Sequence, residues 1–347
     1  MYFVHPQIRI QDLYRYLFGH AMSKRISHVQ NYFPDKQIVF TDMGRSAFKI
    51  IIEKLNLRNS EILMPSYICD IFSPILEKYN IKPIFLDIDL RTFHIKLEEI
   101  EKKITPNTKA IFVCHTYGLL FDVEKIKKFG LPIIEDCAHA FGIKPKSDIA
   151  FFSLYKQFPA LRGGMLVCPK DWEIHLPKTS FNFRDFISLL NCFPIFAFLF
   201  KKFGQGMAPR MLRKEKGMEP AALNRVSLKL FSYSLTDFEK SLGKRKKLAL
   251  FFQSELKKLG FEVQESENNV FCYLSALMPK GLEHRRDKFV EDLRKHGVFC
   301  NRIWHEPIQL ELPNTLEASK RIINFPLQNH YTEKDITKMI IAIKKVL

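Results

Sequence analysis

The chain of 347 residues lacks the short motifs that mark several common enzyme classes. It has no GxGxxG fingerprint, no GxxxxGK(S/T) loop, no HExxH pair and no GxSxG elbow. Its histidines and cysteines do not show the spacing of a metal-ligand set, so we expect no bound metal. These absences disfavour dinucleotide binding, P-loop phosphoryl transfer, zinc hydrolysis and serine-hydrolase chemistry.

The chain also lacks the features of an exported protein. Its seven cysteines include no CxxC pair, and Cys114, Cys137 and Cys168 lie in apolar, strand-like surroundings, where a free cysteine behaves as a small hydrophobic residue. The N-terminus shows no basic start, apolar core and small-residue cleavage site of a signal peptide. We therefore expect a cytoplasmic protein with reduced thiols.

Acidic residues are the scarcer charged class, with 37 against 54 basic residues and a formal net charge of +17. This excess favours anionic partners such as nucleotide diphosphates, acidic lipids or nucleic acid. The basic run Lys244–Lys247 falls within an amphipathic helical pattern. We interpret it as a solvated face and expect no nucleic-acid partner, because no nucleic-acid motif accompanies it.

Apolar runs of strand length alternate with helical patterns from residue 38 onward. This alternation predicts an α/β fold in which helices sandwich a large, mostly parallel sheet, with ligands at the carboxyl ends of the strands. The length predicts two domains. We expect an N-terminal arm over residues 1–35, a large domain over 36–230 with an apolar and basic insert at about 181–216, and a smaller C-terminal α/β domain over 231–347.

The stretch 131–167 carries the clearest chemical pattern. One apolar run ends at the acidic pair Glu135-Asp136, and the next leads into Lys156, with Gly163-Gly164 beyond it. A lysine just after a buried strand is desolvated, so we expect its pKa to fall and its amine to become nucleophilic. A lysine and an acid in this arrangement suit a pyridoxal phosphate Schiff base. In isolation, each residue has a simpler interpretation as a solvated loop lysine or a helix-capping aspartate.

This stretch closely resembles the DegT/DnrJ/EryC1/StrS family of pyridoxal phosphate-dependent sugar aminotransferases. Glu135–His139 takes the place of the family's Glu-Asp-x-Ala-Gln/His block, and Ser153–Lys156 that of its Ser-Phe-x-x-x-Lys block. Gly163-Gly164 matches the family's Gly-Gly pair. The serine-to-lysine spacing is two residues shorter here than in the commonest form. The resemblance covers about residues 36–165 and 230–347.

The resemblance implies a fold-type I pyridoxal phosphate enzyme. Lys156 would bind the cofactor and transfer protons, Asp136 would pair with the pyridine nitrogen, and His139 would lie near the cofactor's edge. Residues 44–46 open a helical pattern, where backbone amides either bind phosphate or are simply capped. The remaining implied cofactor-binding residues are Gly44, Arg45, Ser46 and Ser153 at the phosphate, and Tyr67 or Cys69 over the ring.

Three more positions match the family on the substrate side. His115 and Tyr117 belong to a Val-His-x-Tyr-Gly-like block that lines the rim of the family's active site. Asn182 lies in an Asn-aromatic-Arg element, from which the family's partner subunit reaches the phosphate. The resemblance therefore implies a homodimer with active sites near the subunit boundary.

The implied reaction is amino transfer, with glutamate as the expected donor, to a keto-sugar on a nucleotide carrier. A dehydratase of the same fold would carry histidine in place of Lys156. A non-catalytic regulatory or membrane-associated descendant is the alternative, motivated by the altered Tyr67–Cys69 loop and by the insert.

The insert contains fifteen mostly apolar residues, 186–200, followed by a basic segment. They are too few to span a bilayer, which takes about 20 residues. One interpretation is a buried helical hairpin or a dimer contact. The other is peripheral contact of residues 186–203 with the inner face of a membrane, with aromatic side chains in lipid and basic ones on headgroups.

Overall fold

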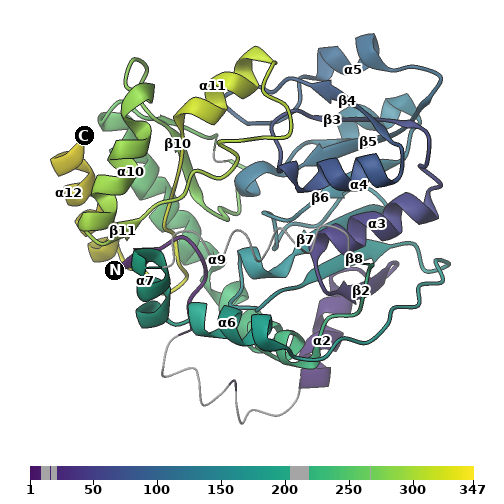
Figure 1. Cartoon of the computed structure of the whole chain (residues 1–347), viewed down its shortest axis with the longest axis horizontal. Helices are drawn as coiled ribbons and strands as arrows, with labels where there is room; N and C mark the ends of the chain where they lie inside the picture. Colours follow the sequence, from purple (N-terminus) through teal and green to yellow (C-terminus); the bar gives the residue numbers. More distant parts are fainter. Residues whose placement is uncertain (9–15, 17–21, 204–218, 266) are drawn as a thin grey trace.

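The computed structural model describes residues 1–8, 16, 22–203, 219–265 and 267–347. Its central sheet contains β2 (Gln37–Thr41), β3 (Glu61–Pro65), β4 (Lys82–Leu86), β5 (Thr108–Cys114), β6 (Ile133–Asp136), β7 (Ile149–Ser153) and β8 (Gly164–Cys168). The strand order is β2-β8-β7-β6-β5-β3-β4 (Figure 1). From β7 to β4 all neighbours are parallel, whereas β8 runs antiparallel to both β2 and β7. The expected mostly parallel sheet is confirmed.

Alternate residues of the strands pack against helices on the two faces of the sheet. On one face, Phe112 of β5 contacts Phe48 of α3 (Gly44–Lys54), close to α4 (Ser73–Lys78). On the other face, Val113 belongs to the same apolar cluster as Ile100 of α5 (Leu97–Lys103) and the 3-10 helix Val123–Phe129. Because both faces are covered, the strands are nearly continuous apolar runs that end abruptly at their polar carboxyl ends.

The C-terminal part of the chain has its own small sheet and core. Strands β9 (Glu262–Val263), β10 (Leu274–Leu277) and β12 (Ile322–Phe325) form an antiparallel sheet in the order β12-β10-β9. Apolar residues of α9 (Arg225–Lys258), α10 (Arg286–Lys295) and α12 (Glu333–Val346) pack on it. Helix α11 (Pro313–Arg321) leads into β12.

One expected boundary falls inside a helix, and the N-terminal segment pairs with a distant part of the chain. Helix α9 has 34 residues and contacts both α2 (Met22–Asn31) and α12, so the boundary expected after residue 230 falls inside a helix. At the N-terminus, β1 (Tyr2–Phe3) pairs in parallel with β11 (Val298–Phe299). The N-terminal segment is therefore attached to the C-terminal part of the chain.

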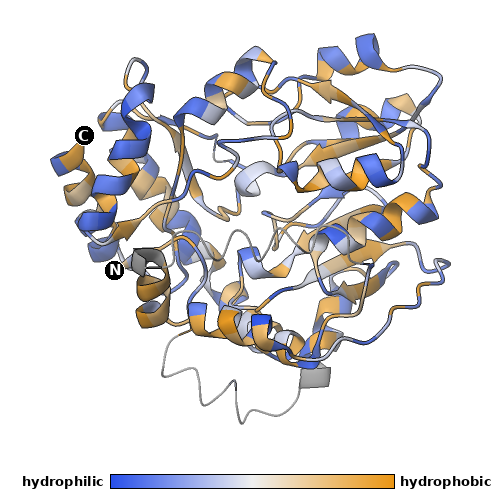
Figure 2. Cartoon of the chain, in the orientation of Figure 1, coloured by the Kyte–Doolittle hydropathy of each residue, from blue (hydrophilic) through white to orange (hydrophobic). Residues whose placement is uncertain are grey.

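The insert begins with two short helices, α6 (Phe183–Asn191) and α7 (Pro194–Phe203). Figure 2 shows that both helices are rich in hydrophobic residues. The interpretation as a buried hairpin is wrong, because Phe183 is 69% exposed and Ile195 is 63% exposed. No single helix of the described residues is long and apolar enough to span a membrane; only the pair Phe183–Asn191 and Pro194–Phe200, bent by 106°, passes that test together. The basic segment 204–218 lies outside the described residues.

Candidate active site

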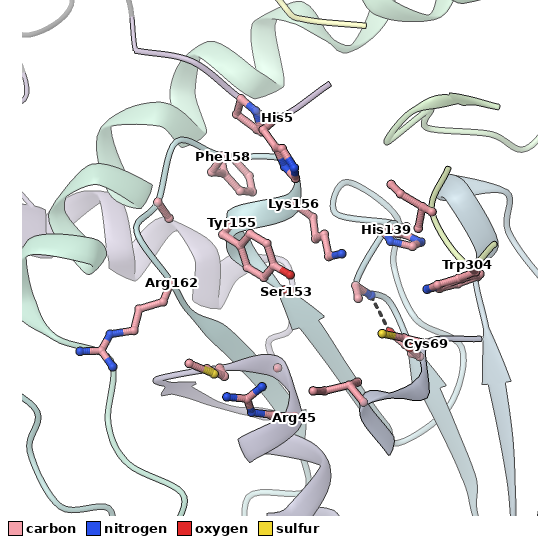
Figure 3. A pocket seen from close by; sticks show the side chains of 18 of the residues that line it. His5, Arg45, Cys69, His139, Ser153, Tyr155, Lys156, Phe158, Arg162 and Trp304 are labelled. Carbon is pink, nitrogen blue, oxygen red and sulfur yellow. Dashed lines mark hydrogen bonds between the residues drawn. The ribbon is translucent and has the colours of Figure 1, made fainter. Parts of the chain in front are cut away.

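A cavity of about 660 Å³ lies at the carboxyl ends of the central strands, between the sheet, α6 and the C-terminal part of the chain (Figure 3). Seven of the predicted site residues surround it. These are Gly44, Arg45, Cys69, Asp136, His139, Ser153 and Lys156.

Lys156 and Asp136 reach this cavity from neighbouring strands. Asp136 is the last residue of β6, and Lys156 closes the 3-10 helix Leu154–Lys156 that follows β7. The two strands are parallel, and Asp136 lies in register with Phe151. Parallel pairing therefore carries the acid and the amine to the same edge of the sheet.

Asp136 is almost fully buried, and its Oδ1 accepts a hydrogen bond from Ala138 N at 2.8 Å. Burial raises the pKa of Asp136 to about 6, against the opposing effects of that hydrogen bond and of nearby Lys156. A buried carboxyl of this kind gains most from a cationic partner within the cavity.

The pKa of the Lys156 amine differs from the expectation. Burial lowers its pKa, but the Tyr155 hydroxyl and the thiols of Cys69 and Cys272 favour the charged form, and its pKa is raised overall. The expected fall in pKa is wrong, because desolvation is not the only influence on a lysine at this position.

The N-terminus of α3 forms the wall beneath Lys156. Its N-cap residue, Met43, makes no side-chain capping hydrogen bond. Both Gly44 and Arg45 line the cavity. A Cβ atom on Gly44 would lie 3.3 Å from the Phe152 carbonyl oxygen, so the tight approach of α3 to β7 favours glycine there. An uncapped helix start beside an arginine suits a phosphate group.

Gly164, from the pair Gly163-Gly164, allows a second close approach at the same helix start. A Cβ atom on Gly164 would lie 2.5 Å from the Met43 carbonyl carbon, which is closer than real side chains come. Gly164 therefore allows β8 to pass directly under the start of α3. Ser153, at the end of β7, lines the cavity beside this point, whereas Ser46 is buried outside it.

Cys69, His139 and Trp304 provide the walls around the middle of the cavity. His139 stacks on Tyr117 at 5.6 Å between ring centroids and lies 5.0 Å from Trp304. Burial, together with nearby Lys156, holds the pKa of His139 well below its usual range, so the imidazole is neutral. Burial raises the pKa of the Cys69 thiol, which is likewise neutral.

Tyr67 does not enter the cavity. Its ring is fully buried against Phe93, and its hydroxyl is hydrogen-bonded to the Tyr117 hydroxyl at 2.9 Å. Tyr117 also donates a hydrogen bond to the Ile303 carbonyl oxygen at 2.7 Å, and it too lies behind the wall. The expected role of Tyr67 over the ring is corrected, since the aromatic wall comes from His139 and Trp304 instead.

His115 is a buried structural residue and not part of the rim. Its Nε2 lies 2.7 Å from Glu135 Oε2, and its Nδ1 accepts a hydrogen bond from Phe121 N at 2.9 Å. Glu135 Oε1 accepts hydrogen bonds from the backbone N–H groups of Lys146 and Ser147. His115 and Glu135 lie close to the Cys137 sulfur, but their own atoms are already engaged within the protein.

Asn182 caps α6 and lies away from the cavity of its own chain. Its side chain accepts hydrogen bonds from Arg184 N at 3.0 Å and Asp185 N at 3.1 Å. The predicted contact of Asn182 with the cofactor phosphate therefore stays a prediction about a partner subunit.

Several cavity residues were not predicted from the sequence. Arg162 lines the cavity, and its Nε is buried with no hydrogen-bond partner among the described residues. His5 reaches the cavity from the N-terminal segment, and Arg302 and His305 reach it from the loop after β11. No local pattern marks these residues, because only the tertiary fold brings them to Lys156.

The donor set fits pyridoxal phosphate. A lysine lies beside a buried acid, a helix start without a side-chain cap lies below them with Arg45, and Ser153 lines the same space. This combination, at the carboxyl ends of a mostly parallel sheet, defines the class of fold-type I pyridoxal phosphate enzymes.

The chain belongs to the DegT/DnrJ/EryC1/StrS aminotransferase family, whose model matches residues 19–344. It is 22% identical over 354 residues to GDP-perosamine synthase of Caulobacter vibrioides, covering 90% of this chain and 86% of that protein. It is 25% identical over 268 residues to dTDP-4-amino-4,6-dideoxy-D-glucose transaminase of Escherichia coli, covering 74% of this chain and 67% of the relative.

Solved structures share the fold over the whole chain. Spr1654 from Streptococcus pneumoniae in its PLP form superposes with a TM-score of 0.74 at 15% identity, covering 100% of this chain and 99% of the other. DesV from S. venezuelae, solved with a ketimine intermediate, superposes with a TM-score of 0.71 at 19% identity and 98% coverage of both chains. The resemblance drawn from stretch 131–167 is confirmed, and the family is pyridoxal phosphate-dependent.

Proposed function

We propose that this protein uses pyridoxal phosphate to transfer an amino group from an amino acid to a keto-sugar on a nucleotide carrier. The observation that carries the proposal is the arrival of Lys156 and Asp136 at one cavity from neighbouring strands. The relatives named as GDP-perosamine synthase and dTDP-sugar transaminases support the substrate class.

The cavity residues divide into those that hold the phosphate and those that hold the ring. The backbone of Gly44 and Arg45, with the Ser153 hydroxyl, would bind the phosphate at the start of α3. The Asp136 carboxylate would keep the pyridine nitrogen protonated, and the flat side chains of His139 and Trp304 would border the ring. When bound, the cofactor supplies an electron sink for charge developing on the carbon that carries the amino group.

Lys156 has two tasks in this proposal. Its Nζ binds the cofactor, and it then takes a proton from one carbon and returns it to another, as a general acid and base. Partial exposure of Lys156 to the cavity gives the amine room to reach both positions. We propose glutamate as the amino donor, and Arg45 and Arg302, two of the arginines on the cavity wall, suit a dicarboxylate.

The visible absorption spectrum tests the proposal. Purified protein with added pyridoxal phosphate should turn yellow, and glutamate should convert the spectrum to that of the pyridoxamine form. Lys156→Ala should abolish the yellow band, whereas Lys128→Ala, which removes a lysine that is 63% exposed, should leave it unchanged. A wild-type protein that stays colourless at saturating cofactor would contradict the proposal.

We further propose that the protein is a cytoplasmic homodimer whose contact includes the outward side of α6 and α7. All seven cysteines are free thiols, which suits a reducing compartment. Helix α6 supplies Ser188 and Asn191 to the cavity, and Cys192 follows at its C-cap, so a partner covering α6 would close the cavity's outer side. The exposed apolar residues of the two helices are Phe183, Phe186, Ile195, Phe196, Leu199 and Phe200.

Sedimentation velocity tests the dimer against the competing occupant, a membrane surface in contact with residues 186–203. The wild type should sediment as a dimer, and the variant Phe183→Ser/Ile195→Ser as a monomer with an unchanged far-UV spectrum. A monomeric wild type that floats with anionic liposomes would overturn the dimer contact and assign this side to lipid.

A further inference from the structure

A second cavity, of about 280 Å³, lies next to the first. Pro6 and Phe158 line both cavities, so they form the wall between them. The chain changes sides at this wall, because Lys156 lines the first cavity and the next residue, Gln157, lines the second. One face of α9 closes the other side of the second cavity.

Two side-chain amides on this cavity each have one atom without a hydrogen-bond partner among the residues the structure describes. Gln157 is 4% exposed; its Oε1 accepts a hydrogen bond from Phe141 N at 2.7 Å, and its Nε2 has no partner. Gln7 donates from Nε2 to the His5 carbonyl oxygen at 3.2 Å, while its Oε1 has no partner. A buried polar group without a partner is costly, so this cavity offers one donor and one acceptor to a bound molecule.

The same cavity carries an excess of positive charge. Lys240 and Lys244 lie one turn apart on α9, beside Arg245, and Asp237 is the acid that lines the cavity with them. Three basic groups and one acid leave a net charge of about +2 at full ionisation. Across the described ranges, no carboxylate forms an ion pair with Lys240, Lys244 or Arg245.

Arg245 is the most constrained of these cations. The residue is 4% exposed. Its guanidinium donates to the carbonyl oxygens of Phe271 and Cys272, both at 2.7 Å, and to Asn329 Oδ1 at 2.9 Å. All three acceptors are neutral. A buried cation whose hydrogen-bond acceptors are all neutral favours an anion in the adjacent space.

We propose that the second cavity is a binding site for a phosphoryl group. Phosphoryl oxygens would accept from Lys240, Lys244 and the Gln157 Nε2 amide, and a monoprotonated phosphate also has an O–H for Gln7 Oε1. The ligand is inorganic phosphate or the phosphate end of a nucleotide carrier. The site stands apart from Lys156 and does not depend on the proposed amino transfer.

The wall made by the N-terminal segment is held at both ends, so the site is preformed. The Gln328 side-chain amide donates to the carbonyl oxygens of Phe3 at 2.8 Å and His5 at 2.7 Å. Beyond Pro6 and Gln7, Ile8 N donates to the Cys192 carbonyl oxygen at 2.7 Å. The segment therefore lies fixed between the C-terminal part of the chain and α6.

Isothermal titration calorimetry of the full chain, saturated with pyridoxal phosphate to fill the first cavity, tests the proposal. The probes are inorganic phosphate and uridine diphosphate. The variant Lys240→Gln/Lys244→Gln should weaken binding at least tenfold. The matched control Lys246→Gln/Lys247→Gln removes the same charge from the same helix outside the cavity and should change binding less than twofold.

A second variant tests the buried amide. Gln157→Glu keeps the acceptor for Phe141 N but replaces the free donor with a negative group. It should therefore abolish phosphate binding. The thermal unfolding midpoint of the variant reports whether the protein still folds. Displacement of phosphate by uridine diphosphate assigns the site to a carrier, and binding of phosphate alone assigns it to the free anion. Equal losses of phosphate binding in both double variants, or no binding of either probe to the wild type, would overturn the proposal. Phosphate binding that persists in Lys240→Gln/Lys244→Gln but disappears in Arg45→Ala would also overturn it.

Discussion

Arg162 and Asp185 form a nearly buried ion pair, with 2.8 Å between Arg162 Nη2 and Asp185 Oδ2 and side-chain exposures of 12% and 3%. The same carboxylate oxygen accepts hydrogen bonds from Asn182 N and from Asn224 Nδ2, both at 3.1 Å. Asn182 caps α6 and Asn224 caps α9. Asp185 therefore joins the starts of two helices to the cavity wall that carries Arg162.

We expect Asp185→Ala to lower the free energy of unfolding by about 3–5 kcal/mol, because it leaves Arg162 buried without its partner. Urea denaturation measures this loss. The control is Asp148→Ala, which removes a carboxylate that is 79% exposed and pairs with Lys36. Such a surface pair contributes about 0–1 kcal/mol, so similar losses in the two variants would refute the role given to Asp185.

Asp136 should cost stability in the protein without cofactor. Its pKa is raised to about 6, so between the ordinary aspartate pKa and 6 the folded state binds more protons than the unfolded state. Stability therefore falls as the pH rises through this window, and the full penalty applies above it. Two pKa units correspond to about 3 kcal/mol, so cofactor-free Asp136→Asn should be up to about 3 kcal/mol more stable than wild type at pH 8.

The measurement is urea denaturation of both cofactor-free proteins from pH 4 to pH 8. The difference should grow with pH up to about 6 and then level off. The same substitution should weaken binding of pyridoxal phosphate. Asp136 would then lower the stability of the cofactor-free protein while strengthening cofactor binding. A variant that is less stable than wild type at pH 8 would show that burial does not dominate at Asp136.

The pKa of the neighbouring carboxyl, Glu135, shifts in the opposite direction. Burial raises its pKa, but the hydrogen bond and charge of His115 and the bonds from Ser147 outweigh burial, and its pKa is lowered overall. A lowered pKa contributes stability above the ordinary glutamate pKa, and this is lost as the pH falls. Glu135→Gln should therefore destabilise the protein at pH 7 by about 2–3 kcal/mol, with a smaller difference below pH 4. Denaturation at the two pH values checks this, and a difference that grows on acidification would contradict it.

The sequence pattern was sufficient to predict which polar residues meet at the strand ends. Asp136 and Lys156 each follow a buried apolar run, and parallel pairing of β6 with β7 brings consecutive strand ends together. The glycines at 44 and 164 were also singled out in the sequence, through the phosphate-site pattern and the Gly-Gly pair, and the structure adds that close packing of a helix start on the strands excludes side chains there. These features depend on local periodicity and on one general property of parallel sheets.

The rest of the site depends on contacts between distant segments. Tyr67 lies in the expected loop, but its hydrogen bond to Tyr117 holds the ring behind the wall. Trp304 takes the place beside His139, from a position 165 residues further along the chain. No periodicity links such positions, and neither a single loop nor its residue types reveal which aromatic ring will turn inward.

Trp304 gives a direct optical test of the cavity. The chain has two tryptophans, and only Trp304 lines the cavity. Trp172 accepts a hydrogen bond from Gln37 at its backbone oxygen, beside the start of β2, and it is not among the residues that line the cavity. In Trp172→Phe, added pyridoxal phosphate should quench most of the remaining fluorescence, because the cofactor would lie against the indole.

In Trp304→Phe, the quenching of the remaining Trp172 should be clearly weaker at the same cofactor occupancy, which the absorption of the bound cofactor reports. Phenylalanine keeps an aromatic ring against Tyr117 and His139, so we expect a stability loss of only about 1–2 kcal/mol for this variant. Trp304→Ala should lose about 3–5 kcal/mol, because it opens a cavity in the aromatic cluster. Equal quenching in the two single-tryptophan proteins would contradict the placement of the cofactor against Trp304.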